Sequence, residues 1–207
     1  MDSPTDIPTI SASSAHECTE DRIVDAAIRI LGADPHASMA AVALASGVGR
    51  ATVYRHYSTR DVLIRAIRLR ALRDCQQALT PAPLDQACAT EALGAVVAIL
   101  LPMLDRYRVL LDAPPPDRSD PEQGKLTDAI ERPLLALIRR GQSVGEFDAQ
   151  LPATFVLEVL TGVLRAARAA MAAGEVSAES ASALAVRALL SGIGTGDPQA
   201  SGPNPTG

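Results

Sequence analysis

Apolar residues recur at three- and four-residue spacing along most of the chain, which predicts helices rather than strands. The first such pattern spans residues 19–31, with Thr19 as the expected N-cap, and Gly32 and Pro35 follow it. The residues expected on its buried stripe are Ile23, Ala26, Ala27, Ile30 and Leu31.

The stretch SMAAVALASGVGRATVYRHY, residues 38–57, predicts two short helices joined by a tight turn. Ser38 can cap the first helix, and Gly47 can adopt the left-handed conformation that ends it. The second helix directs Val53 and Tyr57 inward and leaves basic and hydroxyl side chains outside. A small residue in the turn and a polar, basic second helix are typical of a helix-turn-helix that enters the major groove of DNA.

Further helical patterns follow, separated by Pro- and Gly-rich breaks. A fourth helix, with Thr59 as its N-cap, is predicted to run to about Leu79. The segment 113–121 contains four prolines and is predicted to be an exposed loop. The remaining predicted helical stretches are 84–111 with a kink or boundary at Pro102, 123–144, 152–173, and 178–191 with Ser177 as its cap.

Composition supports an all-helical fold, because 47% of the residues are hydrophobic but only 2% are aromatic. Such a core is filled mainly by Ala, Leu, Val and Ile, and Ala and Leu favour helices. No run of 18 or more uncharged apolar residues is present, so we expect no membrane span, and the acidic N-terminal segment does not resemble a signal peptide. The scattered Cys18, Cys75 and Cys88 are expected to be reduced thiols of a cytoplasmic protein.

The charge of the chain is divided unevenly. The formal net charge is −5, but residues 20–73 hold nine arginines and five acidic residues, a net charge of +4, which leaves −9 for the remainder. A basic segment joined to an acidic remainder is expected of a DNA-binding domain that is linked to a domain of another kind.

Residues 20–66 resemble the N-terminal DNA-binding domain of the TetR family of transcriptional regulators. The matching text is RIVDAAIRIL followed by MAAVALASGVGRATVYRHYSTRDVLIRAI. The resemblance implies that the third helix lies in the major groove and that the protein binds a palindromic operator in double-stranded DNA. The DNA-contacting residues it implies are Ser38, Arg50, Ala51, Thr52, Tyr54, Arg55, His56 and Arg60.

These residues are expected to differ in role. Arg50, Ala51 and Thr52 would face bases and adjacent phosphates, since Arg can bind guanine bidentately and small apolar groups suit a thymine methyl. Tyr54, His56 and Arg60 would bind phosphates and set the register. The chain departs from the family pattern at Gly49, where a Ser or Thr commonly caps the recognition helix. It departs again in the second helix, where Ala40, Ala41 and Leu44 stand in place of polar residues.

The resemblance also implies an organisation for the whole chain of about nine helices. We expect a disordered N-terminal arm (1–18), a three-helix helix-turn-helix DNA-binding domain with its linker helix (19–79), a helical ligand-binding and dimerisation domain (80–192) and a disordered tail (193–207). The last two helices would form a homodimer through Val156, Val159, Leu160, Val163, Leu164, Ala167, Met171, Leu184 and Leu189. A pocket for a small hydrophobic effector would be lined by Leu101, Met103, Leu104, Tyr107, Leu111, Leu137, Phe155 and Leu160.

The leading prediction is therefore a dimeric repressor that a small hydrophobic ligand releases from its operator. One alternative is a helix-turn-helix regulator whose second domain binds a protein partner or no effector, and a core without a cavity would favour it. A second alternative is an enzyme on a helical scaffold. We do not expect an enzyme, a metal or a cofactor, because paired carboxylates, a catalytic Ser/His/Asp series, a Gly-rich phosphate loop and a metal cluster are all missing from the sequence.

Overall fold

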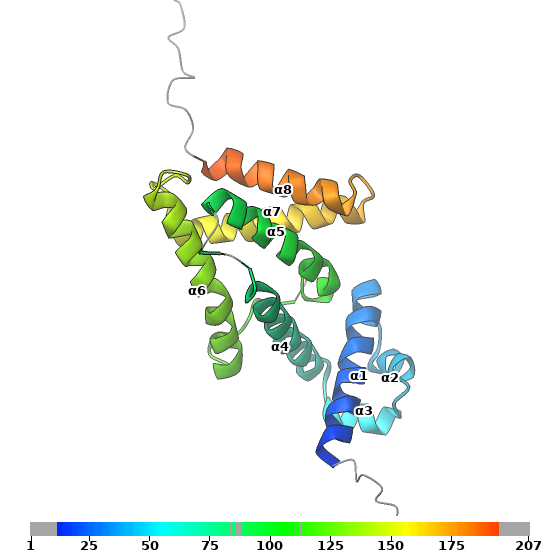
Figure 1. Cartoon of the computed structure of the whole chain (residues 1–207). Coiled ribbons are helices and arrows are strands. Elements are labelled where there is room, and N and C mark those ends of the chain that lie inside the picture. The colour runs from blue at the N-terminus through cyan, green and yellow to red at the C-terminus, as the bar shows by residue number, and fades with distance from the viewer. Residues whose placement is uncertain (1–11, 83, 86–87, 112, 195–207) are drawn as a thin grey trace, which may run out of the picture. The chain divides into compact units, whose positions relative to one another are not determined.

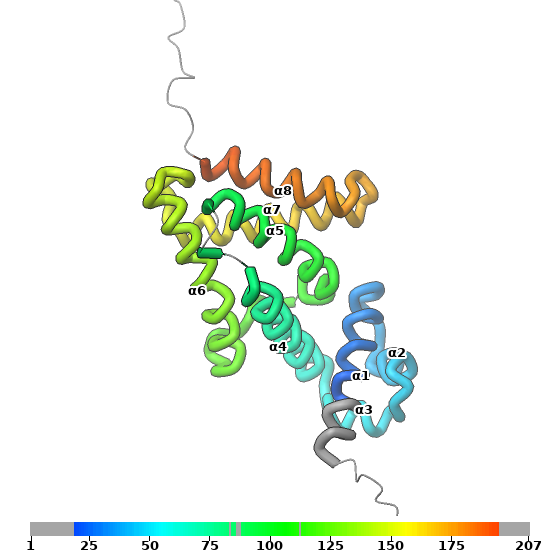
Figure 2. Tube along the Cα trace, in the orientation of Figure 1, coloured from blue at the N-terminus to red at the C-terminus, as the bar shows by residue number. Residues whose placement is uncertain are grey.

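The computed structural model describes residues 12–82, 84–85, 88–111 and 113–194, with side chains from Thr19 onward (Figures 1 and 2). All described elements are helical except for one isolated bridge between Phe147 and Gly194. The elements are α1 (Ala12–Ala33), α2 (Met39–Ser46), α3 (Arg50–His56), α4 (Arg60–Leu79), α5 (Ala89–Arg106), the 3-10 helix η1 (Arg108–Leu110), α6 (Pro121–Ser143), α7 (Ala153–Ala172) and α8 (Ala178–Ile193). The prediction of an all-α chain is confirmed.

The described chain separates into two compact units. The first unit comprises the described residues of Met1–Arg70 and Arg106–Pro115, and the second those of Ala71–Asp105 and Pro116–Gly207. Helix α4 therefore contributes residues to both units. The sequence-based domain limits at residues 18, 79 and 192 stay predictions.

The start of α1 differs from the prediction. The helix begins at Ala12, seven residues before the expected cap Thr19. Residues 12–18 contain no proline or glycine, so their backbones can form two extra turns of helix. The expected disordered arm therefore includes residues that are helical, and residues 1–11 and the predicted tail beyond residue 194 lie outside the described residues.

Pro102 does not interrupt the helical stretch in which it lies. Helix α5 continues from Ala89 through Pro102 to Arg106. Pro102 and Ala98, whose carbonyl loses its usual N–H partner, are both exposed, so water can solvate that carbonyl. For this reason the described chain has eight α-helices and one 3-10 helix instead of about nine helices with a break at this proline.

The predicted caps are confirmed at several helix starts. Ser38, Thr59 and Ser177 accept hydrogen bonds from the backbone N–H groups of Ala41 (3.2 Å), Val62 (3.3 Å) and Ser180 (3.2 Å). Each bond satisfies one donor that the first turn of a helix leaves without a partner.

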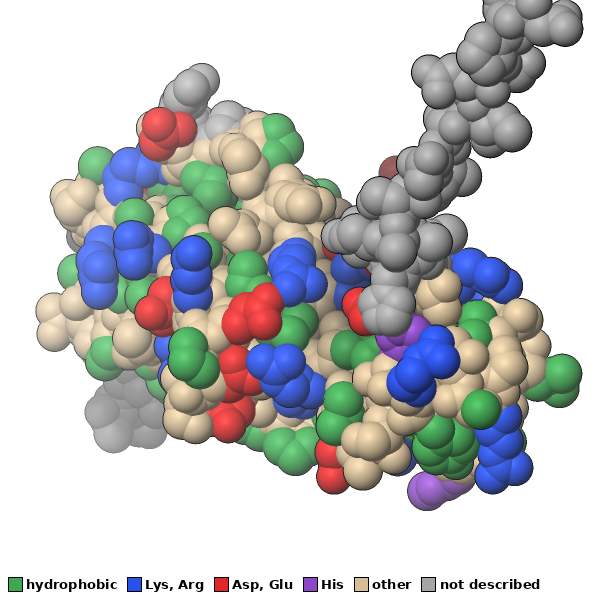
Figure 3. All heavy atoms as spheres, turned by 90° about the horizontal axis from the view of Figure 1, so that it is seen from below, with side chains coloured by type: hydrophobic (Ala, Val, Ile, Leu, Met, Phe, Trp, Pro, Cys, Tyr) green, Lys and Arg blue, Asp and Glu red, His purple; other side chains and the backbone are tan. Residues whose placement is uncertain are grey.

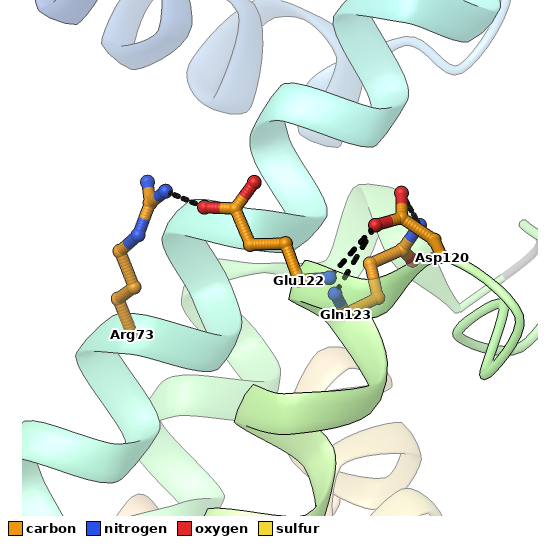
Figure 4. A network of polar contacts seen from close by, with 4 residues as sticks. All are labelled: Arg73, Asp120, Glu122 and Gln123. Atoms are coloured by element: carbon orange, nitrogen blue, oxygen red, sulfur yellow. Dashed lines mark hydrogen bonds and ion pairs between the residues drawn. The ribbon is translucent and has the colours of Figure 1, made fainter.

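Helix α6 starts within the segment that was expected to be a loop. Asp120 caps it and Pro121 is its first residue, where a proline costs no hydrogen bond. The Asp120 carboxylate accepts from the N–H of Glu122 (3.1 Å), the N–H of Gln123 (3.4 Å) and the Gln123 side chain (2.9 Å). Figure 4 shows this cap beside the ion pair between Glu122 and Arg73 of α4, which ties the start of α6 to the linker helix.

The core of the second unit is built from α5, α6, α7 and α8. Figure 1 shows α7 and α8 lying side by side, and their packing buries Leu160, Leu164 and Leu189 at 5% exposure or less. Phe147 is fully buried against Gly141, where a Cβ atom would lie only 2.3 Å from the Phe147 ring. A glycine at position 141 therefore lets the bulkiest side chain of this core reach the helix backbone.

Five of the nine residues expected at a dimer interface belong to this internal core instead. These are Val156, Leu160, Leu164, Ala167 and Leu189, each at most 9% exposed. They face the protomer's own interior because α7 packs on both α6 and α8. The four other expected residues, Val159, Val163, Met171 and Leu184, remain partly exposed or exposed.

Candidate nucleic-acid interface

Helices α2 and α3 form a helix-turn-helix within the first unit. Gly47 has a φ of 65° and donates its N–H to the carbonyl oxygens of Ala43 and Leu44, as expected for a glycine that ends a helix. The buried Ser46 hydroxyl donates to the Ala43 oxygen (2.9 Å) and accepts from the Val48 N–H (3.3 Å). The turn between the two helices is thus closed by its own polar groups.

An arginine from α1 holds this turn in place. Nη2 of Arg22 donates to the Ser46 oxygen at 2.9 Å and lies 3.4 Å from the Gly47 oxygen. Nothing in the sequence pattern points to this role of Arg22, because a charged residue on an exposed face of a helix gives no periodic signal.

Helix α3 is anchored on one side and exposed on the other. Val53 is fully buried and Tyr57 is 7% exposed, so both pack inward as predicted. Arg50, Ala51, Tyr54 and Arg55 are exposed, and Thr52 is half-buried. Gly49 is the N-cap of the helix and, as expected for glycine, provides no side-chain hydrogen bond to its first turn.

Arg50 and Tyr54 interact along the exposed face of α3. The Arg50 guanidinium lies 5.6 Å from the centre of the Tyr54 ring, one helical turn away, which is a cation–π distance. This contact restrains an otherwise flexible arginine at the start of the helix, where bases would be read.

Helix α2 presents an apolar outer face. Leu44 is 87% exposed, and Ala40 and Ala41 are half-buried. These are the positions at which the sequence departs from the polar pattern of the family, and the structure directs none of them into the core.

His56 has a different environment from the one expected of a phosphate ligand. Its side chain is only 3% exposed, and its Nδ1 lies 3.2 Å from Oε1 of Glu20 in α1. Because α1 covers the end of α3, the imidazole joins two helices of the unit rather than facing outward. The expected phosphate contact at this position is therefore withdrawn.

Arg60 is likewise engaged within the unit. Its Nη1 donates to the Ala37 oxygen (2.9 Å) and its Nη2 to the Pro35 oxygen (2.5 Å). These bonds fasten the connector between α1 and α2 to the start of α4. Arg60 therefore has a positioning role that the sequence did not reveal.

Charge is dispersed on the face of the molecule that is seen from below. In this view Lys and Arg side chains are spread among hydrophobic and neutral ones instead of forming one continuous patch (Figure 3).

The described residues contain no cluster of three or more His, Cys, Asp or Glu that could hold a metal ion. No described helix has the length and apolar character needed to span a bilayer.

The residues expected to line an effector pocket lie at several different places in the described part of the chain. Leu137 lines a hollow of about 400 Å³ between α4 and α6, whereas Leu160 lines a hollow of about 180 Å³ formed by α5, α6 and α7. Tyr107 and Leu111 belong to the first unit, where Tyr107 is 5% exposed. Leu101 is buried core, Met103 and Leu104 are half-buried, and Phe155 is 53% exposed on the surface.

The helix-turn-helix region is similar in sequence to known proteins. Residues 23–67 match the model of the bacterial regulatory proteins of the tetR family. A segment of 55 residues is 46% identical to the HTH-type transcriptional repressor LfrR of Mycolicibacterium smegmatis, and this segment spans 27% of the chain and 29% of that repressor.

Solved structures extend the similarity to most of the chain. The crystal structure of the TetR-like regulator LfrR from Mycobacterium smegmatis in complex with proflavine has a TM-score of 0.69 at 26% identity, covering 86% of this chain and 99% of that one. A TetR-like regulator from Rhodococcus sp. RHA1 shares the fold alone, with a TM-score of 0.62 at 19% identity over 90% of this chain and 98% of that one. The domain match, the helix-turn-helix geometry and the fold all agree in their similarity to the TetR family of transcriptional regulators.

Proposed function

We propose that the protein is a cytoplasmic homodimeric repressor that binds a palindromic operator in double-stranded DNA. The observation that carries this proposal is the exposed N-terminal half of α3, in which Arg50 and Ala51 face outward from a turn that Arg22 holds. A helix presented in this way fits the major groove, where arginine can read guanine and an apolar group can contact thymine.

The proposed contacts divide into base reading and phosphate binding. Arg50, Ala51 and Thr52 read bases at the start of α3. Tyr54 and Arg55, both exposed, bind phosphates beside them. Ser38 adds a phosphate contact from the start of α2, because its hydroxyl accepts from the Ala41 N–H and can still donate its proton.

Dimerisation follows from the need to read more than a few base pairs. A two-fold dimer presents two reading helices to two half-sites, which requires a palindrome. The proposed interface uses the partly exposed apolar residues of α7 and α8, namely Val159, Val163, Met171 and Leu184. The adjoining surface of α8 is also apolar at Val186 and Leu190, which border a shallow hollow.

Sizing by light scattering tests this interface. Val163→Glu should give a monomer, because dimerisation would bury an unpaired charge. Arg132→Glu also introduces a glutamate, at an exposed position of α6, and should leave the dimer intact. A Val163→Glu dimer that is as stable as the native one would exclude this surface.

The proposed effector is a small, largely apolar molecule that binds in the second unit. The hollow of about 400 Å³ is bordered by Leu79, Leu137 and Pro133, and its volume lies within the range of small-molecule sites, about 300–1,000 Å³. The solved LfrR structure in complex with proflavine supports an aromatic ligand class. Such a ligand would release DNA if it prefers the arrangement that does not bind DNA. The hollow favours this reading over a regulator without an effector.

Binding to duplex DNA provides the first test. An Arg50→Ala, Tyr54→Ala double variant should lose at least tenfold in affinity for a random duplex pool at a stated salt concentration, as measured by fluorescence anisotropy. Arg132→Ala removes a charge from the exposed face of α6 and should bind as the native protein does. Equal affinities for all three proteins would remove α3 from the interface.

A further inference from the structure

A second basic site lies on the first unit, apart from the reading helix. A hollow of about 480 Å³ is lined by Asp25, Ile28 and Arg29 of α1 and by Arg106 and Arg108. All five residues belong to the first unit, although the two groups are far apart in the sequence. Three arginines and one aspartate give the lining a net charge of +2.

Two of the three guanidinium groups are held in position by their neighbours. Nε of Arg108 donates to the Gly32 oxygen at 2.8 Å, and this carbonyl is one of the last in α1. The Arg106 guanidinium lies 5.3 Å from the centre of the Tyr107 ring. Charged groups that are fixed before a ligand arrives bind it at a lower entropic cost.

The third guanidinium group, that of Arg29, is not held in position by a described neighbour. Arg29 is exposed, and no hydrogen bond or ion pair joins its side chain to any residue that the structure describes. Asp25 lies one helical turn before it and lines the same hollow, yet the two form no ion pair within the described chain. Arg29 therefore adds a cation to the hollow without a protein anion that neutralises it.

The hollow is remote from the end of α1 that contacts the reading helix. Glu20 of α1 contacts His56 of α3, whereas Arg29 lies nine residues further along α1, about 13 Å at the rise of an α-helix. Figure 1 shows α3 beside the N-terminal part of α1, with the rest of that helix running away from it. DNA in contact with α3 would thus lie near the other end of α1 from Arg29.

We propose that this hollow binds a small molecule carrying a phosphate or pyrophosphate group. Guanidinium groups bind such oxyanions through paired, charge-assisted hydrogen bonds, and a doubly charged anion matches the net charge of the lining. The volume leaves room for more than the anion itself, and the apolar wall at Ile28 would contact the remainder of the ligand. The site is separate from the hollow proposed for the effector in the second unit.

Calorimetric titration of the full-length protein with sodium pyrophosphate, at constant ionic strength, tests the proposal. We expect one saturable site per chain and an affinity at least tenfold lower in Arg29→Gln. Arg132→Gln removes the same charge from an exposed position of α6 and should change the affinity less than twofold. Failure of the native protein to saturate, or equal losses in the two variants, would overturn the proposal.

A second measurement separates a free anion from a DNA phosphate. The dependence of duplex binding on salt should have the same slope in the native protein and in Arg29→Gln. A slope that is smaller by about 0.9 in the variant would assign Arg29 to a DNA phosphate and would overturn a separate anion site. The calorimetric result decides the matter even if the protein binds no duplex, so it does not depend on the repressor proposal.

Discussion

Nη2 of Arg22 donates a hydrogen bond to the backbone oxygen of Ser46, at 2.9 Å, and so joins α1 to the turn of the helix-turn-helix. The same nitrogen lies 3.4 Å from the Gly47 oxygen. Carbonyls at the end of a helix lack partners within it, and here α1 supplies one. The position of α3 therefore depends on a residue outside the two helices that define the motif.

Replacement of Arg22 should loosen the first unit. We expect Arg22→Ala to lower the free energy of unfolding by about 1.5 kcal/mol, the low end of the range for a hydrogen bond from a charged group, because Arg22 is exposed. Urea unfolding followed by circular dichroism measures this change. Arg55→Ala also removes an exposed arginine from the first unit, and should cost less than about 0.5 kcal/mol. Equal losses in the two variants would contradict the role given to Arg22.

Residues of α3 should differ in their effect on DNA sequence preference. Arg50→Ala and Thr52→Ala should change the ranking of operator sequences, because they remove groups that face base edges. Tyr54→Phe and Arg55→Gln should weaken binding to all sequences alike, because phosphates carry no sequence information. Competition binding on a set of single-base variants of one operator measures both effects. Uniform losses in all four variants would refute the division of roles.

Tyr57 should make the stability of the protein depend on pH in the alkaline range. Burial, and then the charges of Glu20 and Asp21, raise the pKa of Tyr57 from 10.0 to about 12. Between these values the folded state binds more protons than the unfolded state. The contribution of Tyr57 is therefore complete below pH 10 and is lost as the pH rises toward 12.

Urea unfolding at pH 9, 10 and 11 measures this dependence. Tyr57→Phe should flatten the decline above pH 10, whereas the exposed Tyr54→Phe should leave it unchanged. Burial and the charge of Asp74 also raise the pKa of Cys75, from 9.0 to about 11, but this thiol contributes alike to both variants. Parallel pH profiles for the two variants would show that Tyr57 is not the group responsible.

The cap of α6 should contribute measurably to the stability of the second unit. Asp120→Ala leaves the N–H groups of Glu122 and Gln123 without their acceptor and should cost about 1 kcal/mol of unfolding free energy. Asp120→Asn retains a side-chain oxygen at the same place and should cost less than half as much. Thermal and urea unfolding of the two variants compare these values, and equal costs would mean that the carboxylate charge, not the cap, provides the stability.

The sequence predicted the helix-turn-helix well because its signals are local. The cap at Ser38, the left-handed Gly47 and the burial of Val53 each depend on residues within a few positions, and all three are found in the structure. A helical period also sufficed to place α7 and α8 within a few residues of their observed bounds.

Contacts between segments that are distant in the sequence could not be predicted from local signals. The contact that holds His56 away from the surface depends on Glu20, 36 residues earlier. Arg60 binds carbonyls more than 20 residues away. The apolar residues of α7 are similar in type, so the sequence could not separate those that face α6 and α8 from those left on the surface. Val156 and Val163 lie about two turns apart on nearly the same side of α7, yet Val156 is 1% exposed whereas Val163 is only half-buried.

Selection of bound DNA from a random duplex pool, read by sequencing at a stated salt concentration, tests the central claim most directly. A two-fold symmetric protein that reads bases through α3 should enrich a palindromic consensus. The enrichment should fall in Arg50→Ala, because the change removes a group that faces the bases. A pool without enrichment over background, or a consensus without two-fold symmetry, would contradict the account of a dimeric operator-binding repressor.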